Sequence, residues 1–543
     1  MVDIKDSPTN RIPLEEVLTP DEYEHIDRFC AQIPDSDTIA ELSLFLENVF
    51  SLRLELDEDI ISGYISDSSN LPGHAAAVAR PGSEREYAII SRACFSAGIP
   101  FTVSAGRSNL TGSATPVSGI IISLANMNAP EVRVDEQSMT VRCPVGIIVE
   151  DLRKEVLRQS RDTLVFPVDP TSRTDAMVGG SLACNASGFT PGEIGAMRHW
   201  VESLDVILPS GLKIQANRGE YISSKGEFIL LHREHETVWR VPRYQRPAIK
   251  NASGPYSSPD GVMDFIDLIV GSEGLFGIVT ACTLRLSRRP YDYLDLFCSL
   301  PGEKNALQLL DYISKRFSGD FSSLSALEYF GVNCRKYMDH EQKLFVGDNQ
   351  VGVYIQIPLF ERSYDDAAGE WFEILMDADC DIAEAAIKIM INDRDRSLFL
   401  EARHSMPSNS LEVVQRRGTY TIMTDTVVPE DRFGEFLEYT HNLLIGEDLD
   451  YLTFGHLGDC HIHFMVLPEK NQLERATEVY AMIVEKSAFL GGVYSGEHGT
   501  GKRKRDDFLR CYGNDAIQQV RFSKSAVDPH FLLNRGNVIP YQK

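Results

Sequence analysis

The hydrophobic and polar positions along the chain follow two patterns, which change near residue 76. Before this point, the apolar spacing of residues 39–46 is typical of an amphipathic helix, and we expect residues 1–70 to form a helical, acidic surface layer. Residues 83–97 are predicted to form a further helix that ends near Gly98. Short apolar runs separated by glycine predict strands on both sides of that helix, at residues 76–81, 119–124, 132–134 and 139–142.

These elements continue as an α+β pattern over most of the chain. The first α+β block is predicted to run to about residue 289, and a second block of alternating strands and helices covers residues 290–450. A chain of 543 residues is too long for a single core, so two to four domains are expected. Residues 218–263 are polar and too many for a simple connection, which predicts a functional loop or an insertion over a site.

The charge balance restricts the partners of the chain. A formal net charge of -26 repels phosphate backbones and anionic lipid, so we expect no nucleic-acid partner. The basic run at residues 502–505 is more often a solvated loop or an anion contact than a DNA site. Scattered cysteines without a CxxC pair exclude a close-spaced iron–sulfur or zinc-ribbon module, and they indicate a reducing compartment.

The N-terminal residues and the hydropathy indicate where the chain is located. The first 17 residues lack the apolar core of a secretory signal, and no apolar run reaches the roughly 20 residues that span a bilayer. We therefore expect a cytoplasmic protein without an integral membrane segment, peripheral at a membrane at most.

Three glycine-rich loops occur in the first α+β block, at residues 100–112, 166–188 and 271–280. In the first, a strand runs into small residues whose backbone N–H groups suit a pyrophosphate. In the second, small residues let a flat group approach the backbone closely. One such loop is weak evidence, but three in this order predict a dinucleotide site. No GxGxxG follows an early strand, so a nicotinamide cofactor has no evident binding site.

Histidines cluster in the C-terminal part of the chain. His456, His461 and His463 fall in one short run, and Glu497 and His498 follow in Ser-Gly-Glu-His-Gly-Thr-Gly-Lys. Two or three imidazoles with a carboxylate suit Zn²⁺ or Mn²⁺ and leave an open position for substrate. An isolated histidine is more often a hydrogen-bonded core residue, but the clustering favours a site.

Residues 496–502 also fit the GxxxxGK core of a phosphate-binding loop. Arg503 stands where Mg²⁺ binding requires Ser or Thr, so an ATPase is not expected.

The loops and the histidine motifs together resemble the FAD-linked oxidases of the vanillyl-alcohol oxidase / p-cresol methylhydroxylase type, within them the D-lactate, glycolate and D-2-hydroxyglutarate dehydrogenase group. The resemblance covers about residues 70–540. It implies an α+β fold with a two-part FAD-binding domain at residues 71–289, after the helical segment 1–70. A substrate (cap) domain with an antiparallel sheet and helices would follow at 290–455. Residues 456–543 would return to the FAD.

The resemblance also implies how the cofactor is held. The first loop would bind the FAD pyrophosphate, the second would lie along the ribityl and isoalloxazine groups, and the third would lead toward the adenine half. Some relatives attach FAD through a histidine of the first loop; this loop has none, so noncovalent FAD is expected. The implied FAD-binding residues are Ser104, Ala105, Gly106, Arg107, Ser108, Asn109, Gly112, Pro170, Gly179, Gly180, Ser181, Asn185, Ser187, Gly188, Glu273, Gly277, Ile278 and Asn534.

The same resemblance assigns the chemistry. His456, His463 and Glu497 match the ligands of the divalent ion, His498 the general base, and Arg403 the arginine for the substrate carboxylate. Three departures from the family pattern bear on these assignments. His461, next to Cys460, replaces a residue of the commoner Gly-Asn pair, so it either competes for the metal or faces the flavin. Met423 stands where the D-2-hydroxyglutarate enzymes carry lysine, which favours lactate or glycolate. The segment starting at Lys250 resembles the family's Lys-Asn…Gly-Tyr, with Pro255 inserted.

The expected reaction is oxidation of a small D-2-hydroxy acid to the 2-oxo acid. His498 would take the hydroxyl proton and the hydride would pass from C2 to flavin N5. The electrons would then go to a quinone, a cytochrome, a flavoprotein or oxygen, and a homodimer is left open. The alternatives are an enzyme of the same fold acting on an aromatic alcohol or of the alkyl-glycerone-phosphate type, and an electron-transferring FAD subunit.

Overall fold

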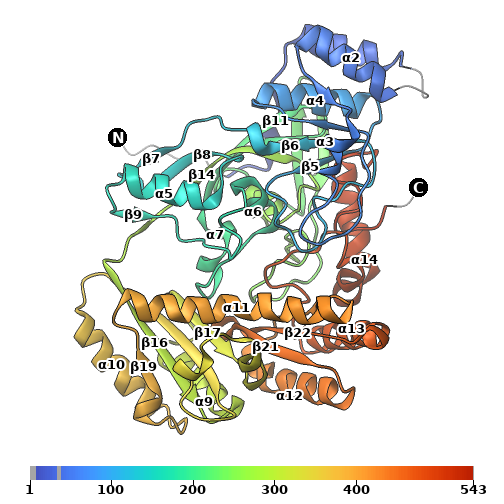
Figure 1. The fold of residues 1–543 in the computed structure, drawn as a ribbon. Coiled ribbons are helices and arrows are strands. Elements are labelled where there is room, and N and C mark those ends of the chain that lie inside the picture. Colours follow the sequence, from blue (N-terminus) through green and yellow to red (C-terminus); the bar gives the residue numbers. More distant parts are fainter. Residues whose placement is uncertain (1–7, 34–37, 542–543) are drawn as a thin grey trace.

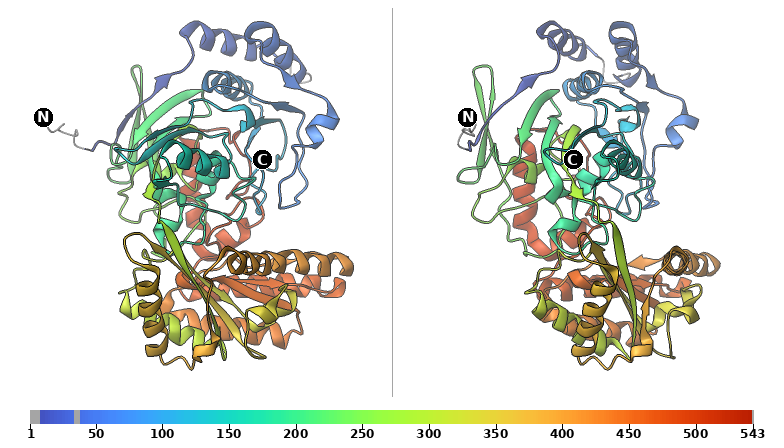
Figure 2. Two further views of the ribbon diagram at one scale, coloured as in Figure 1. Left: turned by 60° about the vertical axis from the view of Figure 1, so that its left-hand side comes forward. Right: turned by 90° about the vertical axis from the view of Figure 1, so that its left-hand side faces the viewer.

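The structure is a computed structural model that describes residues 8–33 and 38–541. The chain forms two lobes, of which one holds the N-terminal half together with α14, and the other holds a broad sheet with its helices (Figure 1). Both lobes are also separate in the turned views of Figure 2. The expectation about a secretory signal falls partly on residues 1–7, which lie outside the described residues.

The N-terminal segment contains the predicted helix and also short strands. The helices are α1 (Pro20–Cys30), α2 (Thr38–Phe50) and α3 (Glu58–Ser62). The predicted helix at residues 39–46 is thus confirmed, and the described part of the segment contains three short strands besides its helices. The added strands pair with later parts of the chain and are too short to show periodicity: β1 (Arg11–Pro13), β2 (Glu15–Glu16) and β3 (Leu54–Glu55).

The two larger sheets of the upper lobe contain all four strands predicted from the apolar runs. The first has parallel pairs at its centre, in the order β3, β4 (Ala77–Ala79), β6 (Ile120–Ser123), β5 (Phe101–Ser104). The second is antiparallel, in the order β2, β11 (Leu212–Asn217), β10 (Val201–Ile207), β14 (Ile278–Arg285), β8 (Thr140–Pro144), β7 (Arg133–Asp135).

Helices and smaller strands complete this lobe. The predicted helix is α4 (Glu84–Ser96), whose first turn is capped by the hydroxyl of Ser83. The other elements are α5 (Val149–Gln159), α6 (Val178–Cys184), α7 (Met197–Trp200), α8 (Phe265–Ile269), β9 (Leu164–Val165) and β15 (Ser287–Arg288).

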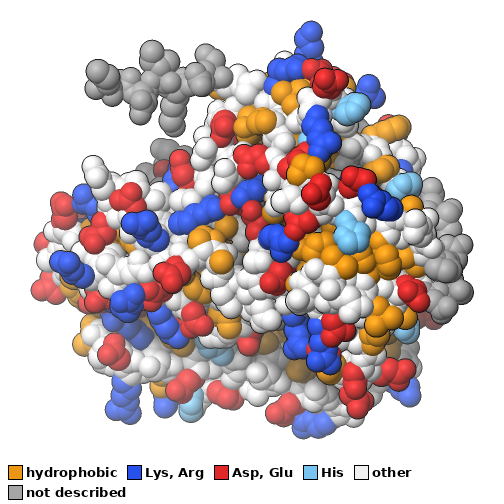
Figure 3. Space-filling model, turned by 90° about the horizontal axis from the view of Figure 1, so that it is seen from above, with side chains coloured by type: hydrophobic (Ala, Val, Ile, Leu, Met, Phe, Trp, Pro, Cys, Tyr) orange, Lys and Arg blue, Asp and Glu red, His pale blue; other side chains and the backbone are white. Residues whose placement is uncertain are grey.

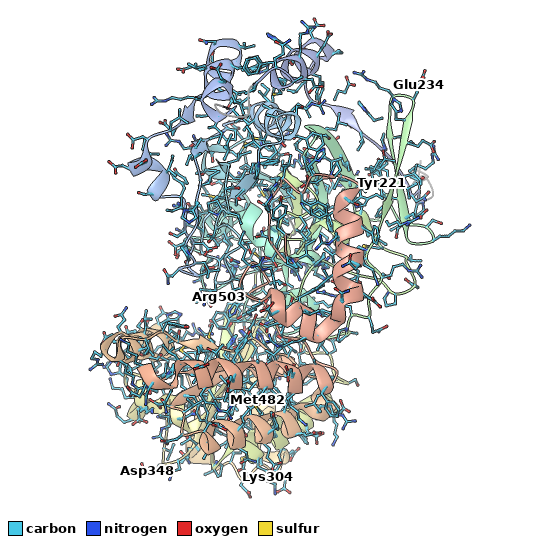
Figure 4. All side chains as sticks on the ribbon, turned by 90° about the vertical axis from the view of Figure 1, so that its right-hand side faces the viewer. Tyr221, Glu234, Lys304, Asp348, Met482 and Arg503 are labelled. Carbon is cyan, nitrogen blue, oxygen red and sulfur yellow. The ribbon has the colours of Figure 1, made fainter. Side chains whose placement is uncertain are left out.

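The polar stretch 218–263 has two parts with different positions. Its first part is a hairpin of β12 (Glu227–His232) and β13 (His235–Arg240), which pairs with β1 and whose tip near Glu234 points away from the second lobe (Figure 4). Its later part lies against the C-terminal motif, because the backbone N of Ala252 bonds to the carbonyl of Ser495. The predicted site is therefore reached by this later part, which includes Lys250, and not by the hairpin.

The second lobe is one antiparallel sheet with helices on both faces. Its strands follow the order β19 (Ile387–Ile389), β16 (Asp292–Leu300), β18 (Val351–Leu359), β17 (Ala326–Phe330), β21 (Tyr451–His456), β22 (His461–Val466), β20 (Ile422–Met423). Leucines of β16 pack with one set of helices: α9 (Glu303–Arg316), α10 (Tyr364–Asp377), α12 (Glu430–Gly446) and α13 (Leu473–Phe489). Phe297, on the opposite side of β16, packs against α11 (Asp393–Arg417), which runs along the face toward the upper lobe (Figure 1).

The predicted boundary at residue 455 falls inside β21. Because β21 and β22 complete the same sheet as β16, the C-terminal segment begins within the cap sheet rather than after it. The chain then returns to the upper lobe through α14 (Arg505–Ser525), where Trp239 Nε1 donates to Ser523 Oγ at 3.1 Å. Arg503 lies at the junction of the two lobes (Figure 4).

The surface charges, the cysteines and the hydropathy of the helices bear on the sequence-based expectations: charges of both signs occur on the surface, and the cysteines of the described residues form no disulfides. On the face seen from above in Figure 3, acidic and basic side chains are interspersed rather than gathered by sign. The ten cysteines are free, and most are buried. Within the described parts of the chain, no helix is long and apolar enough to cross a membrane.

Candidate active site between the lobes

A cavity of about 620 Å³ lies where the three glycine-rich loops meet the C-terminal motifs, a volume typical of cofactor sites. His456, Glu497 and His498 line it together with residues of the loops. Most of the predicted cofactor residues also line it: Ala105, Gly106, Arg107, Ser108, Asn109, Pro170, Gly179, Gly180, Ser181, Ser187, Gly188, Glu273, Gly277, Ile278 and Asn534.

Three predicted cofactor residues lie outside the cavity lining, in segments next to the residues that line it. Ser104 is the buried end of β5. Asn185 ends α6 in a left-handed conformation, and its Oδ1 accepts the backbone N–H of Arg198. The carbonyl of Gly112 accepts from Lys502 Nζ at 3.3 Å.

The glycines let the loops approach one another as the sequence predicts. A Cβ on Gly106 would lie 2.2 Å from the carbonyl oxygen of Asp175, so no other residue fits where the first two loops meet. The hydroxyls of Ser181, Ser187 and Ser272 are buried at the cavity and have no hydrogen-bond partner within the described residues. Buried hydroxyls without partners are costly, so this lining fits a polar ligand of dinucleotide size.

Glu273 ties the third loop to the C-terminal motif. Its carboxylate accepts the backbone N–H groups of Thr500 at 2.6 Å and Gly501 at 2.7 Å, and also the hydroxyl of Ser113. These two amides of the motif at residues 496–502 are thus already bonded to a carboxylate of the chain.

The histidine cluster sits on the hairpin of β21 and β22. His456 pairs in register with His461, and His461 and His463 share one face because strand side chains alternate. Glu497 lies among them: its Oε2 is 3.3 Å from His456 Nε2, and its Oε1 is 3.2 Å from His463 Nε2. One ligand atom from each of the four side chains lies within 4.8 Å of all the others. The cluster therefore has the donor set and spacing of a divalent-metal site.

Each imidazole has a hydrogen-bond partner on its outer side. His456 Nδ1 bonds to Glu328 at 2.6 Å, His463 Nδ1 to the carbonyl of Thr424 at 3.0 Å, and His461 Nε2 to Asp425 at 2.9 Å. Such partners fix the tautomer and the orientation of metal-ligating histidines.

Asp425 is the fully buried acid that connects this cluster to His498. Its Oδ2 lies 2.8 Å from Lys504 Nζ and 3.4 Å from His498 Nδ1, and it accepts the backbone N–H of His498. Burial alone would raise the pKa of Asp425, but His498 and Lys504 hold it well below its usual value. Burial lowers the pKa of His498 to about 4, against the opposing effect of Asp425, so its imidazole is neutral at neutral pH.

The basic run at residues 502–505 is only partly solvated, since Arg503 is exposed and Lys504 is buried. Lys504 is buried against Asp425, and Lys502 Nζ bonds to Asn537 Oδ1 at 2.6 Å. Lys504 makes the expected anion contact, and the anion is the carboxylate of Asp425 in the same chain.

Arg403 lies next to the cavity rather than in its lining. Its Nη2 is 2.9 Å from Glu328 Oε2, and its guanidinium lies 4.2 Å from the ring centre of Phe189, which does line the cavity. Glu328 thus binds both Arg403 and His456. Burial would raise the pKa of Glu328, but its interactions with His456 and Arg403 lower it to about 2, so it is ionised.

The sequence reasoning gave no role to three buried charged residues of this site. Glu328 and Asp425 are the outer partners of histidines, and the Nζ of Lys250 lies 3.3 Å from Asp459 and 3.6 Å from Glu497. A single acid in the apolar run Ala-Leu-Glu-Tyr-Phe was the available signal for Glu328, because an isolated charge in a buried strand needs a partner.

Comparison with known proteins identifies the class of this fold. The family model described as "FAD binding domain" matches residues 75–216, and the model "FAD linked oxidases, C-terminal domain" matches residues 359–538. Together they span more than half of the chain. The structure of p-cresol methylhydroxylase with substrate bound is similar with a TM-score of 0.65 at 13% identity, over 97% of this chain and 99% of that one. These matches confirm the predicted α+β fold of the p-cresol methylhydroxylase type and define the class as FAD-dependent oxidoreductases.

Curated relatives narrow the group. A D-lactate dehydrogenase of Anaerostipes hadrus is 24% identical, over 90% of this chain and 94% of that protein. A D-2-hydroxyglutarate dehydrogenase of Xanthomonas citri pv. viticola is 25% identical, again over 90% of this chain and 94% of that protein. The chain belongs to the FAD-linked oxidases, in the group that includes these dehydrogenases.

Proposed function

We propose that the chain oxidises a small D-2-hydroxy acid, of the size of lactate or glycolate, to the 2-oxo acid with noncovalently bound FAD. The observation that carries the proposal is the position of His456, His463 and Glu497 beside His498, where the FAD cavity ends at polar, imidazole-rich residues. Such a site suits a hydroxyl and a carboxylate better than an aromatic ring, which would require apolar walls.

The residues of the cavity have distinct roles in this proposal. The backbone of the first loop and the serine hydroxyls hold the dinucleotide. When bound, FAD is the acceptor for the hydride that leaves C2 of the substrate. His456, His463 and Glu497 would hold a divalent ion, which would supply Lewis-acid polarisation of the substrate oxygens.

His498 takes the proton of the substrate hydroxyl. Its Nδ1 faces Asp425 at 3.4 Å, so the proton is accepted at Nε2, and a neutral imidazole can accept it. Asp425 is a positioning residue here, since it holds both the ring and the backbone of His498.

Arg403 is proposed to bind the substrate carboxylate beside Phe189. A guanidinium can hold two carboxylates at once, and the Nε of Arg403 has no hydrogen-bond partner among the described residues. Met423 supplies no cation where a second carboxylate would need one, so a dicarboxylic acid is a poorer substrate. The electron acceptor, a cytoplasmic location and a homodimer stay predictions.

Steady-state oxidation with an artificial electron-accepting dye tests the proposal. D-lactate, L-lactate, glycolate, D-2-hydroxyglutarate and an aromatic alcohol are compared at equal concentration. Turnover of D-lactate or glycolate well above the other substrates is the expected result. Turnover of the aromatic alcohol alone would contradict the proposal and move the substrate to the aromatic-alcohol branch of the fold.

A further inference from the structure

His461 is fully buried within the histidine cluster and differs from its neighbours in one respect. Its Nε2 bonds to Asp425 at 2.9 Å, but its Nδ1 has no hydrogen-bond partner within the described residues. His461 is not part of the cavity lining, so its ring does not face the space that FAD would fill. A buried ring nitrogen without a partner requires an explanation.

The bond to Asp425 fixes which nitrogen of His461 carries the proton. Asp425 is an ionised carboxylate and can only accept, so Nε2 is the protonated nitrogen. In a neutral imidazole the other nitrogen then has a free lone pair. His461 Nδ1 is therefore an acceptor or a metal ligand, and it has no donor to accept from.

The outer bonds of the three imidazoles follow one rule. Glu328, Asp425 and the carbonyl of Thr424 each accept the N–H of one ring, which leaves one lone pair on each ring in its neutral form. For His456 and His463 the remaining nitrogen is the one that faces Glu497. A carboxylate or carbonyl behind the ring is the usual arrangement around a metal-bound histidine.

Gly496 makes room for the His461 ring. A Cβ at this position would lie 2.7 Å from Cε1 and 2.8 Å from Nε2 of His461. The ring is thus held between Gly496 and Asp425 in one orientation.

We infer that His461 binds the divalent ion through Nδ1, as a third imidazole ligand beside His456, His463 and Glu497. This inference rests on the proposed metal site and deepens it. The other acid-rich group, Asp425 with Glu497 and His498, is a poorer cation site because the ammonium of Lys504 already neutralises Asp425. Four protein ligands fill a tetrahedron but leave two positions of an octahedron, enough for the hydroxyl and carboxylate oxygens of a 2-hydroxy acid. Four protein ligands therefore favour a six-coordinate ion such as Mn²⁺ for turnover. A four-coordinate Zn²⁺ would have no coordination position left for substrate.

X-ray absorption at the zinc edge tests this assignment on the whole chain. The protein is stripped of metal, loaded with one equivalent of Zn²⁺ alone, and the bound imidazoles are counted from their scattering. The parent protein should show three imidazoles, and His461→Asn should show two. His441→Asn is the matched control, because His441 also bonds to a glutamate, Glu303, but lies outside the cluster.

Competition with a coloured chelator gives a second readout. Zinc affinity should fall at least about tenfold in His461→Asn and in His461→Gln, and it should be unchanged in His441→Asn. If one variant fails to fold, the imidazole count of the parent protein still decides.

Two imidazoles in the parent protein would overturn the inference and leave the proposed site of His456, His463 and Glu497 intact. Failure of the parent protein to retain zinc would overturn the metal site itself and this inference with it.

Discussion

At the scale of single residues, the site works through pairs of buried charges. Glu328 lies between Arg403 and His456, so one carboxylate both orients the imidazole of the proposed metal site and balances the proposed substrate arginine. Neither pairing is visible in the sequence, because sheet register brings β17 next to β21 and packing of α11 brings Arg403 to Glu328. Motif residues such as His456 and Glu497 could be predicted, whereas their outer partners could not.

Removing the charge of Glu328 should weaken metal binding without removing a ligand. Glu328→Gln is expected to lower Zn²⁺ affinity about 10–100-fold, since His456 loses its outer carboxylate. A chelator competition measures the change. Glu303→Gln is the control, because Glu303 bonds to His441 away from the site. Equal affinities in the two variants would contradict the positioning role of Glu328.

Removing the imidazole of His498 should separate cofactor binding from chemistry. His498→Ala is expected to keep FAD and to lower the rate of anaerobic flavin reduction about 10²–10⁴-fold, because the hydroxyl proton loses its acceptor. Stopped-flow absorbance of the flavin measures the rate. Reduction at the parental rate would show that another group takes the proton.

At the scale of elements, the apolar patterns predicted those strands and helices that have a clear apolar pattern or a cap within their own residues. The strands near residues 78, 121 and 141 and the helix at 83–97 were predicted correctly, since each has a continuous apolar pattern or a capping serine. Strands of two or three residues, such as β1 and β2, were missed because only their partners in the sheet define them.

Helix α11 is attached to the cap sheet by an ion pair with a buried carboxylate, and the strength of this pair can be tested away from the site. Arg396 Nε lies 2.8 Å from Asp295 Oδ2, and the side chain of Asp295 is 2% exposed. Arg396→Met should lower the free energy of unfolding by about 3 kcal/mol, because it leaves a buried carboxylate without its cation. Urea unfolding measures the loss. Arg394→Met, at an exposed position of the same helix, should change it little, and equal effects would contradict this account.

At the scale of the whole molecule, the cavity joins segments far apart in the chain. Gly106, Gly180, Glu273 and His498 all line it, and Asn534 closes it from the C-terminal end by accepting the backbone N–H of Val103. The loops themselves were predictable because glycine marks a close backbone approach locally. Their convergence with Glu328 and Lys250 was not, since it depends on how the two lobes pack.

Filling the cavity should remove the cofactor without unfolding the chain. A Cβ on Gly180 would meet only Ala105, at 3.3 Å, so Gly180→Val extends mainly into the cavity. We expect flavin absorbance per chain to fall strongly, and the melting temperature to approach that of the FAD-free parent because bound ligand stabilises the fold. Gly369→Val, on the exposed side of α10, is the control. Full FAD content in Gly180→Val would place the cofactor elsewhere.

Anaerobic reduction of the bound flavin by D-lactate, with and without prior metal removal, tests the central claim most directly. We expect the flavin absorbance to bleach with D-lactate and not with L-lactate. Deuterium at C2 should slow the bleaching, and chelation should abolish it until Mn²⁺ is restored. Flavin that stays oxidised in the presence of D-lactate, glycolate and D-2-hydroxyglutarate alike would contradict the account, leaving the FAD-binding fold but not the oxidation of a 2-hydroxy acid.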